Sequence, residues 1–242
     1  MQNIVRIALR TSQLSRRELA QRAGVSASTI TRIEQGVMDP TMGTAARILS
    51  AAGLQLPDTP APLCDPAAVR AARSILGGAP AGADDEAWVK TLMRWASPDG
   101  APRPRSLARE AGAAAPPPCR PGAIRFATAW EPLRLFSAAA ATRKGWAVSG
   151  APAAARIGAS AGAGPVVLYA EEAARLSATV NHTDTGSQDV IVLPFDGFSE
   201  SGAWNDGGIV WADPIQVIID CFGLNACVRQ AEALTTDWER AA

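Results

Sequence analysis

The chain has 242 residues, of which 48% are hydrophobic, a share that is sufficient for real hydrophobic cores in more than one domain. Its 23 basic and 23 acidic residues cancel, and a net charge of zero taken alone argues against a nucleic-acid-binding protein. The sequence does not begin with an apolar signal core, and no uninterrupted apolar run approaches the roughly 18 residues of a membrane span. We therefore expect a cytoplasmic protein that makes no contact with a membrane.

The charges are unevenly distributed along the chain. Residues 1–56 carry seven arginines and three acidic residues, residues 57–144 carry 12 basic and eight acidic residues, and residues 145–242 carry four basic and 12 acidic residues. A basic N-terminal part can neutralise DNA phosphates, whereas an acidic C-terminal part is repelled by them. The distribution, unlike the total, is therefore compatible with DNA binding by the N-terminal part.

The cysteines and the single histidine predict neither a metal site nor a disulfide framework. Cys64, Cys119, Cys221 and Cys227 include no pair with CxxC spacing, and His182 is not close to any of them in sequence. Zinc sites are built from closely spaced pairs of Cys and His. We expect reduced thiols, no metal and no cofactor.

Two short helices are predicted at the N-terminus, over residues 4–11 and 16–23. The second has Ser15 before it and Glu18 in its first turn, the pair of residues that forms a capping box. Gly24 follows, at the position where helices commonly end on a left-handed residue.

Two more helices follow after a short turn. Ser26 caps the third helix, which continues to about Gln35, and Ile30 and Ile33 recur at the helical spacing that faces a core. The fourth helix is predicted over residues 42–52. A helix, a short glycine-centred turn and a second helix make the helix-turn-helix arrangement.

The residues around this turn carry a family resemblance. The pattern Leu19-Ala20-x-x-Ala23-Gly24-Val25-Ser26-x-x-Thr29-Ile30-x-x-Ile33-Glu34-x-Gly36 closely resembles the XRE family, the Cro and phage-repressor type of helix-turn-helix domain. The resemblance covers residues 4–56 and implies that the third helix lies in the major groove of double-stranded DNA. It further implies a sequence-specific transcriptional regulator, a repressor that binds inverted half-sites of a DNA operator as a homodimer.

The resemblance also assigns DNA contacts residue by residue. Positions that match the base-contacting residues of the family are Ala27, Ser28, Thr31 and Arg32. Positions that match its phosphate-contacting residues are Arg16, Thr29, Gln35 and Thr41. Arg32 is the strongest base reader because a guanidinium pairs in bidentate fashion with guanine, whereas Ala27 offers at most a contact to a thymine methyl group.

Two alternatives stay open for this domain. Arg32 could instead form a salt bridge with a neighbour such as Glu34 or Glu18. The whole domain could also have lost DNA binding and serve as a protein adaptor, although the net charge of +4 over residues 1–56 argues against this.

The middle of the chain is predicted to be partly linker and partly helical. Residues 57–83 are rich in Pro, Ala and Gly and read as a linker that carries a short helix at 67–76. Residues 84–144 form a mostly helical, basic middle segment, with helices expected over 84–96 and 130–141.

One stretch of this middle segment, residues 102–125, is predicted to be irregular because three consecutive prolines lie within it. Its arginines suggest either an auxiliary contact to DNA or a solvated loop. The arginines are Arg103, Arg105, Arg109, Arg120 and Arg125.

The C-terminal block, residues 145–242, is predicted to be an acidic mixed α/β domain in which strands alternate with helices. Strands are expected over residues 145–149, 166–169, 189–193 and 209–211, and helices after residue 150 and over residues 171–176, 213–222 and 225–238. The fold class is therefore α+β multidomain, with an all-α N-terminal domain.

Spaced motifs in this block carry a second resemblance. Trp146-Ala-Val-Ser-Gly150, Val166-Val-Leu-Tyr169, Ile191-Val-Leu-Pro-Phe-Asp196, Ala212-Asp-Pro-Ile-Gln216 with Asp220, and Gln230-Ala-Glu-Ala-Leu234 look like the C-terminal domain of AbiEi-type regulators. The resemblance covers roughly residues 130–240 and implies an antitoxin with a partner toxin, or a protein-interaction module in which DNA binding is secondary. AbiEi-type proteins usually begin with a winged helix, and this chain departs from that pattern.

We expect no enzymatic activity. The turn Ser149-Gly150 is similar to the Gly-Ser turn of nucleotidyltransferases, but the strand at residues 166–169 lacks the paired carboxylates that would bind divalent cations. His182 and Asp184 lie in a polar loop without a nucleophile beside them.

Overall fold

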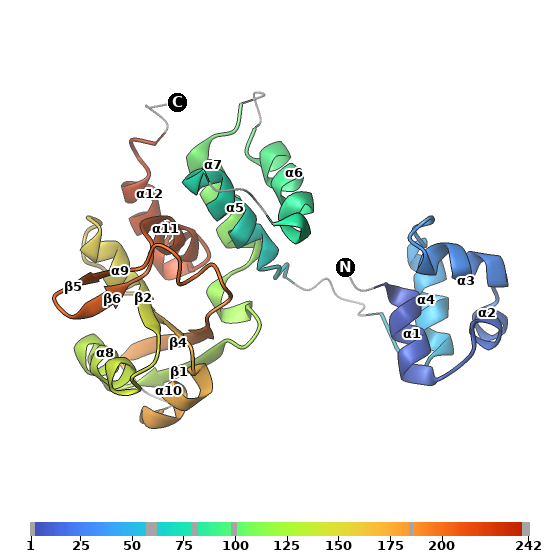
Figure 1. The fold of residues 1–242 in the computed structure, drawn as a ribbon, viewed down its shortest axis with the longest axis horizontal. Coiled ribbons are helices and arrows are strands. Elements are labelled where there is room, and N and C mark those ends of the chain that lie inside the picture. Colours follow the sequence, from blue (N-terminus) through green and yellow to red (C-terminus); the bar gives the residue numbers. More distant parts are fainter. Residues whose placement is uncertain (1–2, 57–61, 79–81, 98–100, 184–185, 239–242) are drawn as a thin grey trace. The chain divides into compact units, whose positions relative to one another are not determined.

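A computed structural model of the chain describes residues 3–56, 62–78, 82–97, 101–183 and 186–238 (Figure 1). The chain divides into two compact units, unit 1 (residues 1–62) and unit 2 (residues 63–242), and each unit has a hydrophobic core of its own. The predicted fold class is confirmed, since unit 1 is helical and unit 2 combines helices with a mixed sheet. Residues 57–61 and 79–81 of the predicted linker lie outside the described residues.

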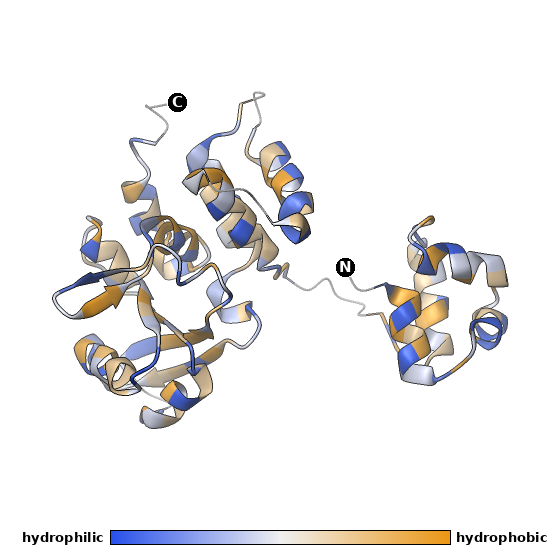
Figure 2. Cartoon of the chain, viewed as in Figure 1, coloured by the Kyte–Doolittle hydropathy of each residue, from blue (hydrophilic) through white to orange (hydrophobic). Residues whose placement is uncertain are grey.

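Unit 1 contains four helices, in agreement with the sequence analysis. They are α1 (Ile4–Ser12), α2 (Arg16–Ala23), α3 (Ala27–Glu34) and α4 (Met42–Ala51). Each contributes to one core, in which Val5, Leu19, Ile30 and Ile48 are completely buried. Apolar and polar residues alternate along α1 in Figure 2, as in an amphipathic helix.

Local capping chemistry sets the ends of α2. The Ser15 side chain accepts a hydrogen bond from the Glu18 amide, and the Glu18 carboxylate accepts one from the Ser15 amide, so the predicted capping box is confirmed. Gly24 ends the helix with φ of 64°, which is a left-handed conformation that few other residues adopt without strain. The two signals place the turn between α2 and α3.

Unit 2 is built on a six-stranded sheet with the strand order β1-β4-β3-β2-β6-β5. The strands are β1 (Ile124–Thr128), β2 (Trp146–Gly150), β3 (Val166–Ala170), β4 (Gln188–Pro194), β5 (Trp204–Asp206) and β6 (Ile209–Trp211). The pairs β3–β4 and β2–β6 are parallel, and the other three pairs are antiparallel. All five residues of β3 are buried, as the continuous apolar run predicts.

Helices surround this sheet. They are α5 (Ala67–Gly77), α6 (Glu86–Trp95), α7 (Pro104–Ala114), α8 (Pro132–Ala141), α9 (Ala151–Arg156), α10 (Ala173–Thr179), α11 (Pro214–Phe222) and α12 (Val228–Leu234), with short 3-10 turns η1 (Ala83–Asp85), η2 (Pro117–Cys119) and η3 (Asn225–Cys227). In Figure 1, α8 and α10 lie on one side of the sheet and α11 lies on the other. The helices α5 and α7 pack against α11. Figure 2 shows α11 as mostly hydrophobic, and seven of its nine residues are buried.

The prediction that residues 102–125 are irregular is wrong. They contain α7 and η2 and the start of β1. Pro104 occupies the first turn of α7, where a missing backbone N–H costs nothing. Residues 84–144, which the sequence sets apart as a middle segment, share one hydrophobic core with residues 145–242, and Leu92, Leu107 and Leu135 belong to it.

A buried polar network ties the sheet to α11 and to the loop after η2. The Arg120 guanidinium lies 2.8 Å from Asp220 Oδ1, with exposed side-chain fractions of 7% and 0%. Asp220 also accepts hydrogen bonds from Ser149 Oγ (2.7 Å), Gln216 Nε2 (2.9 Å) and the Tyr169 hydroxyl (2.9 Å). Burial raises the pKa of the Tyr169 hydroxyl well above its ordinary value, so this group stays a neutral donor.

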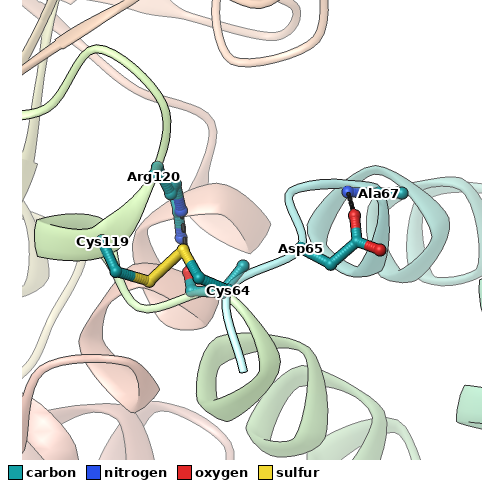
Figure 3. The surroundings of a disulfide bond; sticks show 6 residues. Cys64, Asp65, Ala67, Cys119 and Arg120 are labelled. Carbon is teal, nitrogen blue, oxygen red and sulfur yellow. Dashed lines mark hydrogen bonds between the residues drawn. A yellow bond between two sulfur atoms is a disulfide. The ribbon is translucent and has the colours of Figure 1, made fainter. Parts of the chain in front are cut away.

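The expectation of reduced thiols throughout is also wrong. Cys64 and Cys119 form a disulfide across 55 positions of sequence, with their Cα atoms 6.0 Å apart (Figure 3). Cys221 and Cys227 are free and buried. The pairing was not visible from sequence because the two cysteines are brought together by the packing of α5 and α7, not by local spacing.

The buried network yields a test of what holds unit 2 together. We expect Arg120→Ala to lower the free energy of unfolding by about 3–5 kcal/mol, because it leaves the Asp220 carboxylate buried without a counter-charge. The measurement is urea unfolding followed by tryptophan fluorescence, since every tryptophan of the chain lies in unit 2.

The matched control is the exposed ion pair between Arg125 and Asp189, whose side chains are 61% and 42% exposed. Arg125→Ala should cost at most about 1 kcal/mol, since water screens this pair. Equal losses in the two variants would contradict a special role for the buried pair.

Candidate nucleic-acid interface

The four predicted base-contacting residues share one face of α3. Successive helical residues are turned by about 100°. Ala27, Ser28, Thr31 and Arg32 therefore project opposite to Ile30 and Ile33, which are buried in the core of unit 1. Of the four, Ala27, Ser28 and Arg32 are exposed and Thr31 is half-buried.

Hydroxyl groups at the start of α3 already have partners within the helix. The Ser26 hydroxyl accepts a hydrogen bond from the Thr29 amide (3.0 Å) and lies 2.8 Å from Ser28 Oγ and 2.7 Å from Thr29 Oγ1. Thr31 Oγ1 donates to the carbonyl of Ala27 at 3.1 Å. Thr31 therefore uses its donor within the helix, and the hydroxyls of Ser28 and Thr29 each have one local hydrogen-bond partner before any ligand binds.

The Arg32 side chain, in contrast, has no partner within the described part of the chain. It is exposed and makes no hydrogen bond or ion pair with any residue that the structure describes. The alternative of a salt bridge to Glu34 or Glu18 is not what the structure contains, since Glu34 pairs with Arg16 and Glu18 caps α2. All five donors of the Arg32 guanidinium are therefore available.

Arg16 differs from Arg32 in this respect. Its Nε and Nη2 donate to the two carboxylate oxygens of Glu34 at 2.6 and 2.8 Å. This bidentate pair links the first turn of α2 to the last turn of α3 and cancels the charge of Arg16. The neighbouring Arg17 is exposed and, within the described part of the chain, has no hydrogen-bond or ion-pair partner. Arg17 was not among the predicted phosphate contacts, although it lies in the same first turn of α2 as Arg16.

The remaining predicted phosphate contacts lie at helix ends. Gln35 is the exposed residue that ends α3. Thr41 caps α4, where its Oγ1 accepts from the Thr44 amide at 3.2 Å and donates to Thr44 Oγ1 at 3.0 Å. Exposed amides at helix N-termini attract anions, so the Thr41 end of α4 is chemically suited to a phosphate. Gln35 lies at the C-terminal end of α3, so only its side-chain amide can donate to a phosphate there.

The arginines of residues 102–125 do not form a free basic strip. Arg105 and Arg109 pair with Glu232, Arg120 pairs with Asp220, and Arg125 pairs with Asp189. These contacts lie inside unit 2, so the positive charge that the sequence shows in this segment is largely neutralised there. The auxiliary DNA contact considered from sequence loses its main support.

Groups that suggested other chemistry in unit 2 are engaged structurally. The Ser149 hydroxyl is buried and donates to Asp220, and His182 stacks on Phe126 with ring centroids 4.1 Å apart. Asp184 lies outside the described residues. Among the described residues, no three Cys, His, Asp or Glu side chains gather as a metal site would require, and no helix is long and apolar enough to cross a membrane.

Fold and surface chemistry thus define a helix-turn-helix unit joined to an α+β unit. Comparison with protein families agrees on the first unit: the helix-turn-helix family model HTH_3 matches residues 5–58. No curated protein and no solved structure matches the chain. The AbiEi-like resemblance of residues 130–240 receives no support from these comparisons and stays a prediction.

The Arg16–Glu34 pair predicts a pH dependence for unit 1. Hydrogen bonds from Arg16 lower the pKa of the Glu34 carboxyl below its ordinary value. A carboxyl whose pKa is lowered by folding contributes stability above its unfolded pKa of about 4.3, and this contribution is lost as the pH falls through the folded value. We expect Glu34→Gln to lose less stability than the wild type over that acidic range.

The measurement is thermal unfolding by circular dichroism of a fragment with residues 1–62, a unit with its own core. Parallel pH profiles for the two proteins would show that the pair does not stabilise the fold.

Proposed function

We propose that this protein is a sequence-specific DNA-binding transcriptional regulator, with α3 of unit 1 inserted in the major groove of an operator. The observation that carries the proposal is the exposed, unpaired Arg32 on the face of α3 opposite the core. A bidentate arginine–guanine pair is the commonest specific contact to a base. The match of residues 5–58 to a helix-turn-helix family supports the same conclusion.

The charge of unit 1 also supports the proposal. Its residues 1–56 carry seven arginines and three acidic side chains, which are Glu18, Glu34 and Asp39. Glu34 is paired with Arg16 and Glu18 is turned to the Ser15 amide, so most of the cationic groups stay unneutralised. Such an excess favours DNA phosphates in a salt-dependent manner.

We further propose that the protein acts as a homodimer and represses its own operon through inverted half-sites. Ala27 cannot hydrogen-bond, and the hydroxyls of Ser28 and Thr31 are engaged locally, so one copy offers little sequence information. Two copies on half-sites one helical turn apart double that information. A footprint that covers two half-sites, at a stoichiometry of two chains per duplex, would support this arrangement.

An antitoxin role remains the alternative proposal, and it rests on the AbiEi-like motifs alone. Binding to the product of a neighbouring toxin gene would favour it over autoregulation. We propose no catalytic role, since the Ser149 hydroxyl and the Asp220 carboxylate are committed to the buried network.

The proposal predicts different effects for two arginines of unit 1. Arg32→Ala should reduce discrimination between matched and mismatched duplexes by ~1–3 kcal/mol, because a base contact is lost. Arg17→Ala should weaken binding to every sequence and reduce the slope of log K against log salt by about one, because a phosphate contact is lost. Gel shifts at several salt concentrations, on duplexes selected from a random pool, measure both effects.

Arg134→Ala is the matched control. This exposed arginine of unit 2 lies over the Trp130 ring, 4.0 Å from its centroid, and its removal changes the net charge by the same amount. Binding should be unchanged. If Arg32→Ala and Arg17→Ala behave like this control, unit 1 does not bind DNA through α3.

A further inference from the structure

A pair of sulfur atoms lies where unit 2 begins. Unit 1 ends at Pro62, and Cys64 follows two residues later. Its disulfide partner Cys119 is the last residue of η2, directly before Arg120 of the buried network (Figure 3). The bond therefore connects the beginning of unit 2 with the segment that holds its central ion pair.

The backbone on each side of the disulfide is held by hydrogen bonds that do not depend on it. The amide of Asp65, next to Cys64, donates to the carbonyl of Ala114 at 3.0 Å, and the amide of Cys119 donates to the carbonyl of Pro116 at 3.0 Å. The two Cα atoms are 6.0 Å apart, within the ordinary range for a disulfide. Because these hydrogen bonds hold the backbone on each side, we expect the two thiols to stay close together when the bond opens.

Solvent reaches this pair but not the other cysteines. Cys119 is exposed and Cys64 is half-buried, whereas Cys221 and Cys227 have no exposed surface. Exposed disulfides are typically the labile or regulatory ones, and exposed thiols beside a second cysteine are typical of redox sensors.

We propose that Cys64 and Cys119 form a reversible redox couple that responds to peroxides and to small thiols. In the reduced protein, the Cys119 thiolate attacks a peroxide oxygen. A sulfur–oxygen bond forms, the oxygen–oxygen bond breaks, and the product is a sulfenic acid with release of water or an alcohol. The Cys64 sulfur then displaces the hydroxyl, so that the disulfide forms and a water molecule leaves.

The disulfide is opened again by thiol–disulfide exchange with a small thiol. The thiolate of a small thiol attacks the exposed Cys119 sulfur, and Cys64 leaves as a thiolate. A second small-thiol thiolate then attacks the small-thiol sulfur of this mixed disulfide, so that Cys119 leaves as a thiolate and a small-molecule disulfide is released. Oxidation closes a covalent loop around α5, α6 and α7, and the closed form should resist unfolding more than the open form.

The test uses the full chain, first reduced completely, then treated with hydrogen peroxide, and finally with reduced glutathione without denaturant. The thiol count in denaturant should fall from four to two and return to four. Mass spectrometry should locate the cross-link between Cys64 and Cys119. The urea midpoint from tryptophan fluorescence, which reports on unit 2, should rise on oxidation and fall on reduction.

Variants give the matched controls. Cys64→Ser should form no cross-link and should accumulate a sulfenic acid on Cys119 that a dimedone reagent traps. Cys221→Ser should keep the cross-link and its reversal. Where a variant does not fold, alkylation of the reduced wild type under native conditions still tests accessibility, with Cys119 labelled first and Cys221 and Cys227 protected.

Three outcomes would overturn the proposal: no loss of thiols with peroxide, a cross-link that involves Cys221 or Cys227, or a bond that glutathione does not open in the folded protein. The last outcome would identify a permanent structural disulfide. Gel shifts on the same samples report separately on DNA binding, so a failure of the proposed function does not decide the redox result.

Discussion

The arrangement of unit 2 depends on the buried ion pair between Arg120 and Asp220. Two charges removed from water carry a desolvation cost of several kcal/mol each, which is recovered only when the geometry is good and the remaining hydrogen-bonding groups are satisfied. Here Asp220 accepts from Ser149, Tyr169 and Gln216, while Arg120 donates to the Ala115 carbonyl and the Tyr169 hydroxyl. Arg120 Nη2 makes no hydrogen bond and is compensated only by the charge of Asp220, 2.8 Å away. β2, β3, α11 and the loop after η2 therefore meet in one arrangement, because any shift leaves a buried charge unpaired.

Ion pairs outside the buried network also join distant segments of unit 2, and they explain why its earlier part is basic and its later part acidic. Basic residues from the part of unit 2 before residue 145 pair with acidic residues of the C-terminal block in contacts that join elements distant in sequence. The pairs are Arg73 with Asp213, Arg105 and Arg109 with Glu232, Arg125 with Asp189, and Lys144 with Glu171 and Glu172. The opposite charges of the two segments thus reflect complementarity within one unit. Residues 57–242 carry 16 basic and 20 acidic residues, whereas residues 1–56 carry a net positive charge, so an external polyanion is attracted mainly to unit 1.

Features with local causes were predictable from sequence, and features with distant causes were not. The capping box of Ser15 and Glu18 and the left-handed Gly24 depend on a few neighbouring residues, so the sequence pattern places α2 and its turn correctly. The helix α7 was missed because its neighbouring prolines indicate a loop. Its packing against α11, which the sequence does not show, stabilises the helix instead. A Cβ atom at Gly112 would lie 2.5 Å from the Ile219 carbonyl oxygen, so these two helices approach as closely as glycine permits.

In the candidate DNA-binding site, too, features with local causes were predictable and features with distant causes were not. Family resemblance located the outward face of α3, because a helical repeat with two buried isoleucines fixes which residues point away. It could not show that Glu34 selects Arg16 and leaves Arg32 free, since that choice depends on how α2 and α3 cross. A good bidentate contact supplies ~1–3 kcal/mol of discrimination, whereas specific binding exceeds non-specific binding by about 4–10 kcal/mol. A single Arg32 contact therefore falls short of that difference, which is why the proposed function includes a second copy of unit 1 and a contribution from the shape of the DNA.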